Sequence, residues 1–123
     1  MFNRMVDRSP AALDRVFRAL ASEPRREILR RTASAPCTVT QLAEHFDMSL
    51  AAVSKHVGVL AKARLVRLTV EGRVHWCRLD PDVLDAASAS LDELRSFWSD
   101  RLDGLERFLV RGAPKGRRPR GAS

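Results

Sequence analysis

Residues 38–60 read TVTQLAEHFDMSLAAVSKHVGVL, and this stretch decides the fold of the 123-residue chain. Thr38 and Gln41 stand three residues apart in the pattern of a capping box, which satisfies two free backbone N–H groups at the start of a helix. Ser49, after a short polar turn, is a favoured N-cap for a second helix over residues 50–63. Two short helices joined by a tight turn are the pattern of a helix-turn-helix.

The second of these helices has two different sides. Its apolar residues recur with the spacing of a buried stripe, and they are Leu50, Val53, Val57, Leu60 and Ala61. The opposite side holds small residues and hydrogen-bond donors, which would let the helix approach the floor of a DNA groove. A lysine suits the acceptor atoms of guanine. We therefore expect base contacts from Ala51, Ser54 and Lys55.

Residues 65–79, LVRLTVEGRVHWCRL, alternate in the manner of strands on both sides of a turn and predict a β-hairpin. We expect a three-residue loop of Glu71, Gly72 and Arg73, because a two-residue loop would scatter the apolar residues over both faces. One face would then hold Val66, Leu68, Val70, Val74 and Trp76, and the other Arg67, Thr69 and His75. The expected fold is mainly α with a small β-hairpin, a winged helix-turn-helix.

The chain resembles the ArsR/SmtB family of small bacterial transcriptional repressors over roughly residues 13–109. The resemblance is carried by LDRVFRALASEPRREILRRT at 13–32, by the segment from 38 to 66 and by the hairpin, and V-S-K-H-V-x-x-L at 53–60 is its most specific part. It implies a homodimeric winged helix-turn-helix protein that binds operator DNA as a repressor. Many members of that family release DNA when a metal binds.

Two departures from the family pattern concern metal. The positions that align with the family's paired cysteines are Thr38 and Thr40, and a single thiolate at the neighbouring Cys37 makes no metal site. The family's other metal site uses His and acidic residues of the last helix, but residues 81–110 contain no His. We expect no metal and no cofactor. Leu50 aligns with a polar base-reading position of the family, and its place in the apolar stripe predicts a core residue instead.

Charge is distributed unevenly along the chain. The formal net charge of +7 divides into +2 for residues 1–48, +5 for 49–79, −5 for 80–110 and +5 for 111–123. The positive block coincides with the predicted helix-turn-helix and hairpin, where DNA phosphates would lie. We expect phosphate contacts from six residues, which are Thr40, His56, Lys62, Arg67, Arg73 and His75.

The two remaining helical segments predict a dimer. A stripe of large apolar residues runs along a helix expected at 81–110, and it exceeds what so small a domain can cover. We expect it to pack against a second copy together with the helix that begins at Ser9-Pro10. The expected interface residues are Leu13, Phe17, Leu20, Leu91, Leu94, Trp98, Leu102, Leu105 and Leu109. A ligand pocket among the aromatic residues of the last helix is a less favoured alternative.

Length and composition indicate one domain at 9–110, with a flexible N-terminus at 1–8 and a disordered basic tail at 111–123. No apolar run approaches the roughly 18 residues of a membrane span, and the N-terminus lacks the apolar core of a signal peptide. We therefore expect a cytoplasmic protein with no membrane partner. In that compartment Cys37 and Cys77 are expected as reduced thiols, with redox sensing left open.

The sequence contains no Gly-rich phosphate loop, nucleophile motif or cluster of metal ligands, so we do not expect an enzyme. The function predicted is a DNA-binding transcriptional regulator that acts as a repressor on an inverted repeat. The alternative is a winged-helix module for protein interaction without sequence-specific DNA binding, which would predict a neutral or acidic second helix. The expected partners are double-stranded DNA and a second copy of the chain, and a small-molecule effector is left open.

Overall fold

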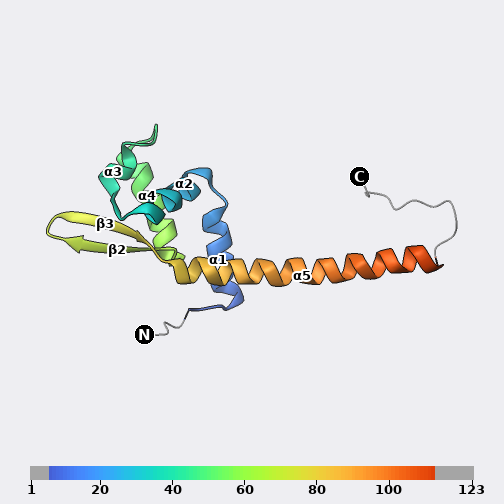
Figure 1. Cartoon of the computed structure of the whole chain (residues 1–123). Coiled ribbons are helices and arrows are strands. Elements are labelled where there is room, and N and C mark those ends of the chain that lie inside the picture. The colour runs from blue at the N-terminus through green and yellow to red at the C-terminus, as the bar shows by residue number, and fades with distance from the viewer. Residues whose placement is uncertain (1–5, 113–123) are drawn as a thin grey trace. The chain divides into compact units, whose positions relative to one another are not determined.

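The computed structural model describes residues 6–112 and consists of helices with one small sheet (Figure 1). The elements are α1 (Pro10–Leu20), α2 (Glu23–Ser34), β1 (Cys37–Thr38), α3 (Val39–Ala43), α4 (Leu50–Lys62), β2 (Val66–Glu71), β3 (Val74–Leu79) and α5 (Pro81–Gly112). This order confirms the winged helix-turn-helix. The expected flexible N-terminus and basic tail lie outside the described residues, apart from residues 6–8 and 111–112.

Side-chain caps fix where the helices begin. The Ser9 hydroxyl accepts from the N–H of Ala12 at 3.2 Å, with a proline in the first turn of α1. Both halves of the expected capping box at α3 are present: Gln41 N–H donates to Thr38 Oγ1 at 3.0 Å, and Thr38 N–H donates to Gln41 Oε1 at 2.9 Å. Ser49 Oγ accepts from Ala52 N–H at 3.1 Å and starts α4. The turn between α3 and α4 is therefore set by local hydrogen bonds.

The sheet has one strand more than the sequence predicted. β1 pairs antiparallel with β3, so the strand order is β1-β3-β2. Cys37 lies opposite Cys77, and Thr38 lies opposite Trp76. Because β1 leads directly into α3, this pairing attaches the helix-turn-helix to the base of the hairpin.

The predicted three-residue loop of the hairpin is wrong. Glu71 pairs with Val74, so the loop is the two residues Gly72 and Arg73. Gly72 has φ +66°, which suits the first central position of a two-residue hairpin turn because glycine has no Cβ to clash there.

This register also corrects the expected faces of the hairpin. Residues paired across the strands share a face, so Leu68 lies with Cys77, and Val70 with His75. Val74 and Trp76 therefore lie on the face opposite to Leu68, and His75 lies on the same face as Leu68. Near the tip the apolar side chains stay exposed, Val70 at 61% and Val74 at 41%. No core there requires them to share one face.

The core lies between the helices and the base of the hairpin. Its fully buried side chains include Ile28, Leu42, Val53, Leu60 and Cys77, which come from α2, α3, α4 and β3. α4 ends in a Schellman motif, in which Arg64 N–H bonds to Ala61 O at 3.0 Å and Leu65 N–H to Leu60 O at 3.0 Å. Arg64 takes the left-handed position of this motif with φ 66°.

By internal contacts the chain divides into two units, residues 1–88 and 89–123, so α5 belongs to both. Asp80 precedes α5, is 1% exposed and accepts from Asp82 N–H at 3.1 Å, so it caps the start of the helix. The first turns of α5 contribute Val83, Ala86 and Ala87 to the buried residues of the first unit. Among the described residues, no helix is both long enough and apolar enough to cross a membrane.

Candidate nucleic-acid interface

α4 presents the residues expected to contact bases on its exposed side. Ala51, Ser54 and Lys55 are all exposed, while Val53 and Val57 on the other side are at most 2% exposed. Burial of one side fixes how the helix is rotated on the core. The three predicted residues therefore face solvent together on one side of α4.

The expected core position of Leu50 is wrong, because this side chain is 52% exposed. Leu50 is the first residue of α4, and α3 ends at Ala43 before it could cover the start of that helix. Helical spacing places Leu50 on the apolar stripe, but a stripe is buried only where another element lies against it. Leu50 instead lines a hollow beside the exposed side of α4.

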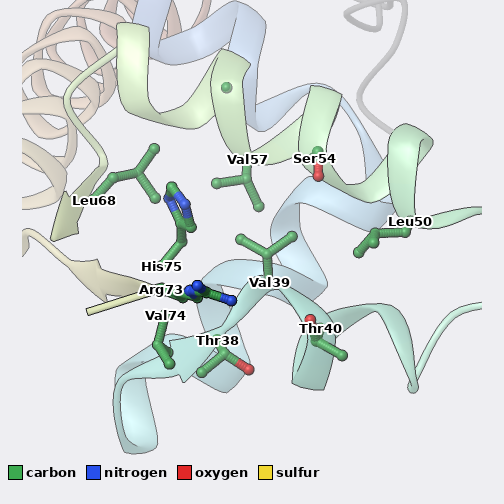
Figure 2. Close-up of a pocket in the computed structure, with 11 residues that line it drawn as sticks. Thr38, Val39, Thr40, Leu50, Ser54, Val57, Leu68, Arg73, Val74 and His75 are labelled. Atoms are coloured by element: carbon green, nitrogen blue, oxygen red, sulfur yellow. The ribbon is translucent and has the colours of Figure 1, made fainter. Parts of the chain in front are cut away.

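That hollow lies between α4, the β1–α3 segment and the hairpin, and it has a volume of about 620 Å³ (Figure 2). We call it the wing hollow. Val57 and Val39 face one another across it, and Arg73 and His75 reach toward it from β3 and its turn. It is lined by Thr38, Val39, Thr40, Leu50, Ser54, Val57, Gly58, Leu68, Arg73, Val74 and His75.

The wing hollow brings together four of the predicted contact residues, Thr40, Ser54, Arg73 and His75, which come from three separate segments. Lys62 and Arg67, which the sequence grouped with them, line a different hollow of about 750 Å³ beside α1. There Arg67 Nε lies 3.6 Å from Oδ2 of the buried Asp80. Five of the six predicted phosphate contacts thus fall into two separate groups, and His56 belongs to neither.

His56 is held by a residue that sequence reasoning missed. Arg25 of α2 places Nη1 3.2 Å from His56 Nδ1, and it also donates to the backbone oxygens of Ala19 at 2.7 Å and Arg18 at 3.1 Å. A guanidinium can only donate, so Nδ1 accepts and the ring proton lies on Nε2. Burial, Arg25 and Lys55 all lower the pKa of His56. Neutral His56 therefore offers one N–H donor on the flank of α4.

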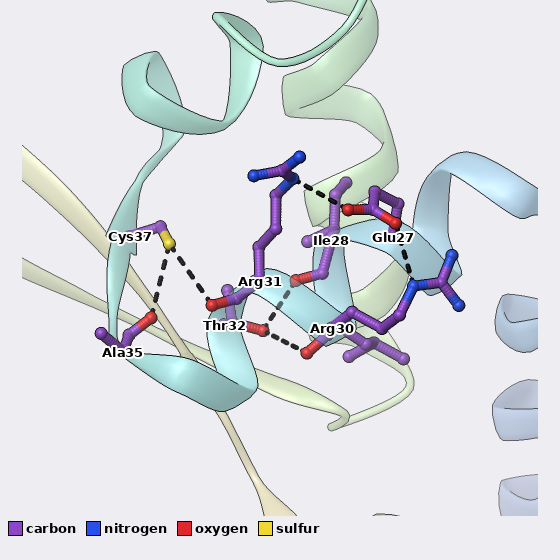
Figure 3. A network of polar contacts seen from close by, with 8 residues as sticks. Glu27, Ile28, Arg30, Arg31, Thr32, Ala35 and Cys37 are labelled. Atoms are coloured by element: carbon purple, nitrogen blue, oxygen red, sulfur yellow. Dashed lines mark hydrogen bonds and ion pairs between the residues drawn. The ribbon is translucent and has the colours of Figure 1, made fainter.

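Polar contacts hold the end of α2 and the chain leading into β1 (Figure 3). Glu27 Oε1 accepts from Arg30 Nε at 2.9 Å, Glu27 Oε2 forms an ion pair with Arg31 Nε at 2.9 Å, and Thr32 Oγ1 donates to Ile28 O at 2.9 Å. The Cys37 thiol donates to Ala35 O at 3.4 Å. These contacts position β1 and hence the capping box of α3.

Neither cysteine forms a disulfide in this structure. Cys77 is fully buried, and burial together with the nearby Cys37 raises its pKa to about 12. Such a thiol is protonated at neutral pH and is a poor nucleophile. Among the described residues, no three His, Cys, Asp or Glu side chains are grouped as metal ligands would be.

The residues predicted for dimerisation differ in exposure between the two units. In α1, Leu13, Phe17 and Leu20 are half-buried. On α5 most of the apolar stripe is more than half exposed in the single chain: Leu91 and Leu94 at 53%, Trp98 at 56%, Leu102 at 59% and Leu105 at 51%, with Leu109 half-buried. A row of large apolar side chains this exposed is typical of a surface that another molecule covers.

Comparison with known proteins gives consistent matches. A model of the helix-turn-helix domain matches residues 20–69. HTH-type transcriptional regulator Rv2034 of Mycobacterium tuberculosis is 39% identical over 102 residues, which are 83% of this chain and 90% of that protein. Transcriptional repressor SdpR of Bacillus subtilis is 29% identical over 72 residues, which are 58% of this chain and 80% of that protein. A solved ArsR-like transcriptional regulator from Rhodococcus sp. RHA1 has a TM-score of 0.71 at 30% identity and covers 80% of this chain and 92% of that one.

Proposed function

The chain belongs to the ArsR-like family of winged helix-turn-helix transcriptional regulators, and from this premise we propose that it represses transcription as a homodimer bound to an inverted-repeat operator. Its general function is DNA-binding transcriptional regulation. The observation that carries the finer proposal is the exposed side of α4, where Ser54 and Lys55 stand beside small residues on a helix whose other side is buried.

In this proposal α4 enters the major groove and reads bases. Lys55 donates to the acceptors of a guanine, Ser54 makes a shorter polar contact, and Ala51 allows the backbone to approach. Gly58 lies on the same helix, and a Cβ added there would meet nothing within 4 Å, so among the described residues none crowds the approach of DNA at this position. Specificity would then come from one short stretch of α4 in each subunit.

Phosphate contacts fix the register of the protein on the duplex without specifying sequence. Thr40, Arg73 and His75 surround the wing hollow and would bind the backbone beside α4. His56 offers its Nε2–H from the flank of the helix, with Arg25 holding its ring. Lys62 and Arg67 lie beside α1, so we assign them a weaker role at the edge of the interface.

Dimerisation would place two copies of α4 on the two halves of an inverted repeat. The apolar stripe of α5 is the proposed contact, and residues of α1 would extend it. A bacterial operator lies in the cytoplasm, so we propose a cytoplasmic location and no catalytic role. The relative named as a repressor supports repression over activation.

The test begins with the DNA upstream of the protein's own coding sequence. We expect the purified protein to protect an inverted repeat there in a footprint, and Lys55→Ala to weaken binding to that site by about 1 to 3 kcal/mol. On a scrambled duplex the same variant should weaken binding much less, because no guanine there is positioned to accept from Lys55. Equal weakening on both duplexes would show that base reading lies elsewhere.

Arg73→Ala is the contrasting variant, because its proposed partner is a phosphate. It should weaken binding to both duplexes alike and reduce the slope of log affinity against log salt by about one for each phosphate that is no longer neutralised. Arg95→Ala removes an equally charged, 79% exposed side chain from α5 and serves as the matched control. The alternative of a protein-interaction module predicts that the wild-type protein itself binds the upstream DNA no better than the scrambled duplex.

A further inference from the structure

We propose that the wing hollow binds a small organic carboxylate, with its apolar body inside the hollow and its carboxylate against Arg73. The proposed ligand site is inferred from the volume and lining residues of the hollow alone. Its regulatory consequence, displacement of DNA from the α4 face, rests on the function proposed above. The ligand would therefore act as an effector that releases the regulator.

Size and lining agree with a ligand site. A volume of about 620 Å³ falls within the roughly 300 to 1,000 Å³ of small-molecule pockets, which are mostly apolar with a few placed polar groups. Two of the apolar lining residues are unusually exposed, Leu50 at 52% and Leu68 at 45%. They come from α4 and β2 and meet at one hollow. DNA phosphates need donors, which these side chains cannot supply, so a second kind of ligand explains them better.

The polar groups of the hollow favour an anion. Arg73 and His75 lie on the wing side, Thr38, Thr40 and Ser54 also line the hollow, and among the described residues no Asp or Glu lines it. Arg73 makes no ion pair with another of the described residues, so its guanidinium is available to a ligand. A guanidinium binds a carboxylate through two parallel hydrogen bonds, which no neutral group matches.

Gly58, which also allows the proposed approach of DNA, leaves room for an occupant of the hollow. A glycine inside a helix is less favourable than alanine, and here no turn or left-handed backbone requires it. A Cβ added at this position would meet nothing within 4 Å, so packing within the chain does not require it either. Gly58 lines the hollow, and its bare backbone leaves room there for a molecule from outside.

The probe for this site is 1-naphthoate, titrated into the DNA-free protein while backbone amides are followed by NMR. We expect saturation near or below millimolar concentration, with the largest shifts at the amides of Ser54, Gly58 and Leu68. The neutral counterpart, 1-naphthalenemethanol, should bind at least about tenfold more weakly because it cannot form the charged hydrogen bonds. Shifts confined to residues 91–110, or equal binding of the two compounds, would overturn the proposal.

Two substitutions in the hollow, Gly58→Leu and Leu68→Asp, test its location, so the conclusion does not depend on whether one variant folds correctly. Gly58→Leu places a better helix former in open space and should fill the hollow, while Val59→Leu enlarges a side chain that does not line it. We expect the first to weaken naphthoate binding at least tenfold and the second to leave it within about twofold. Leu68→Asp, which adds a repelling carboxylate at an exposed position, should weaken naphthoate binding as much as Gly58→Leu does. Unchanged binding in both hollow variants contradicts the site.

Competition with DNA separates this inference from the proposed function. Saturating naphthoate should weaken binding of the wild-type protein to a duplex of mixed sequence at least tenfold, at constant ionic strength. Naphthoate binding by a protein that binds no duplex would refute the proposed function and leave the site standing. DNA binding by a protein that takes up no naphthoate would refute the site alone.

Discussion

Leu102→Ala should weaken the dimer, and the structure gives the size of the effect. Full burial of a leucine side chain contributes about 1.5 to 3 kcal/mol, and Leu102 leaves 59% of its surface exposed in the single chain. Covering that fraction in a dimer would contribute about 1 to 2 kcal/mol in each subunit. A two-fold interface contains the residue twice, so the variant dimer should be less stable by about 2 to 4 kcal/mol. The dissociation constant of the dimer should rise at least about 30-fold.

Sedimentation equilibrium of the full chain over a range of concentrations measures that constant directly. Val110→Ala is the matched control, because Val110 is 80% exposed but lies about 120° around α5 from the centre of the stripe. Its dissociation constant should stay within about threefold of the wild type. A wild-type protein that is monomeric at tens of micromolar, or equal effects of the two variants, would refute the assignment of the stripe to dimerisation.

Four further predictions concern metal ions, the two thiols, the protonation of His56 and the backbone at Arg64. Zinc, cadmium or arsenite at low micromolar excess should leave operator affinity within about threefold, because Thr38 and Thr40 supply no thiolates and Cys77, the cross-strand neighbour of Cys37, is a buried thiol whose raised pKa keeps it protonated; release of DNA by one of these ions in a binding titration would disprove this. In Ellman titrations at pH 8 the half-buried Cys37 should react first, and Cys77, with its pKa near 12, should react only as fast as the protein opens. Burial first, and then Arg25, lowers the pKa of His56, so its contribution to stability is present above pH 6.5 and disappears on acidification. Urea unfolding between pH 7 and pH 5 should show a steeper decrease in stability for wild type than for His56→Gln, and Arg25→Ala should remove only part of the difference. Arg64→Gly should raise the free energy of unfolding by about 1 kcal/mol, because Arg64 holds a left-handed backbone position, and an unchanged urea midpoint would argue against strain there.

Local signals in the sequence are sufficient to predict the helix-turn-helix. Thr38 and Gln41 form the predicted capping box, Ser49 caps α4, and the buried side of α4 is the predicted apolar stripe over most of its length. Each of these features depends on residues three or four apart, which share a helix face. The exposed positions of Ser54 and Lys55 follow from the same periodicity.

The predictions fail where distant segments decide the structure. β1 has only two residues, Cys37 and Thr38, and exists because β3 pairs with it some forty positions later. The hydrogen bond from Arg25 to His56 spans 31 positions and carries no local signal. The predicted hairpin register is wrong because it assumes that all apolar side chains of the hairpin share one buried face. Near the tip Val70 and Val74 are exposed, so no core requires them to share a face. The predicted core position of Leu50 is wrong for the same reason.

The central claim is that two copies of α4 read an inverted repeat, and selection from a library of random duplexes by the purified protein tests it most directly. We predict that the enriched sequences converge on two inverted half-sites about one helical turn apart, centre to centre. The same selection with Lys55→Ala should relax preference at one position in each half-site and preserve the spacing. Enrichment of a single unpaired half-site, or no enrichment over the starting library, would contradict the account.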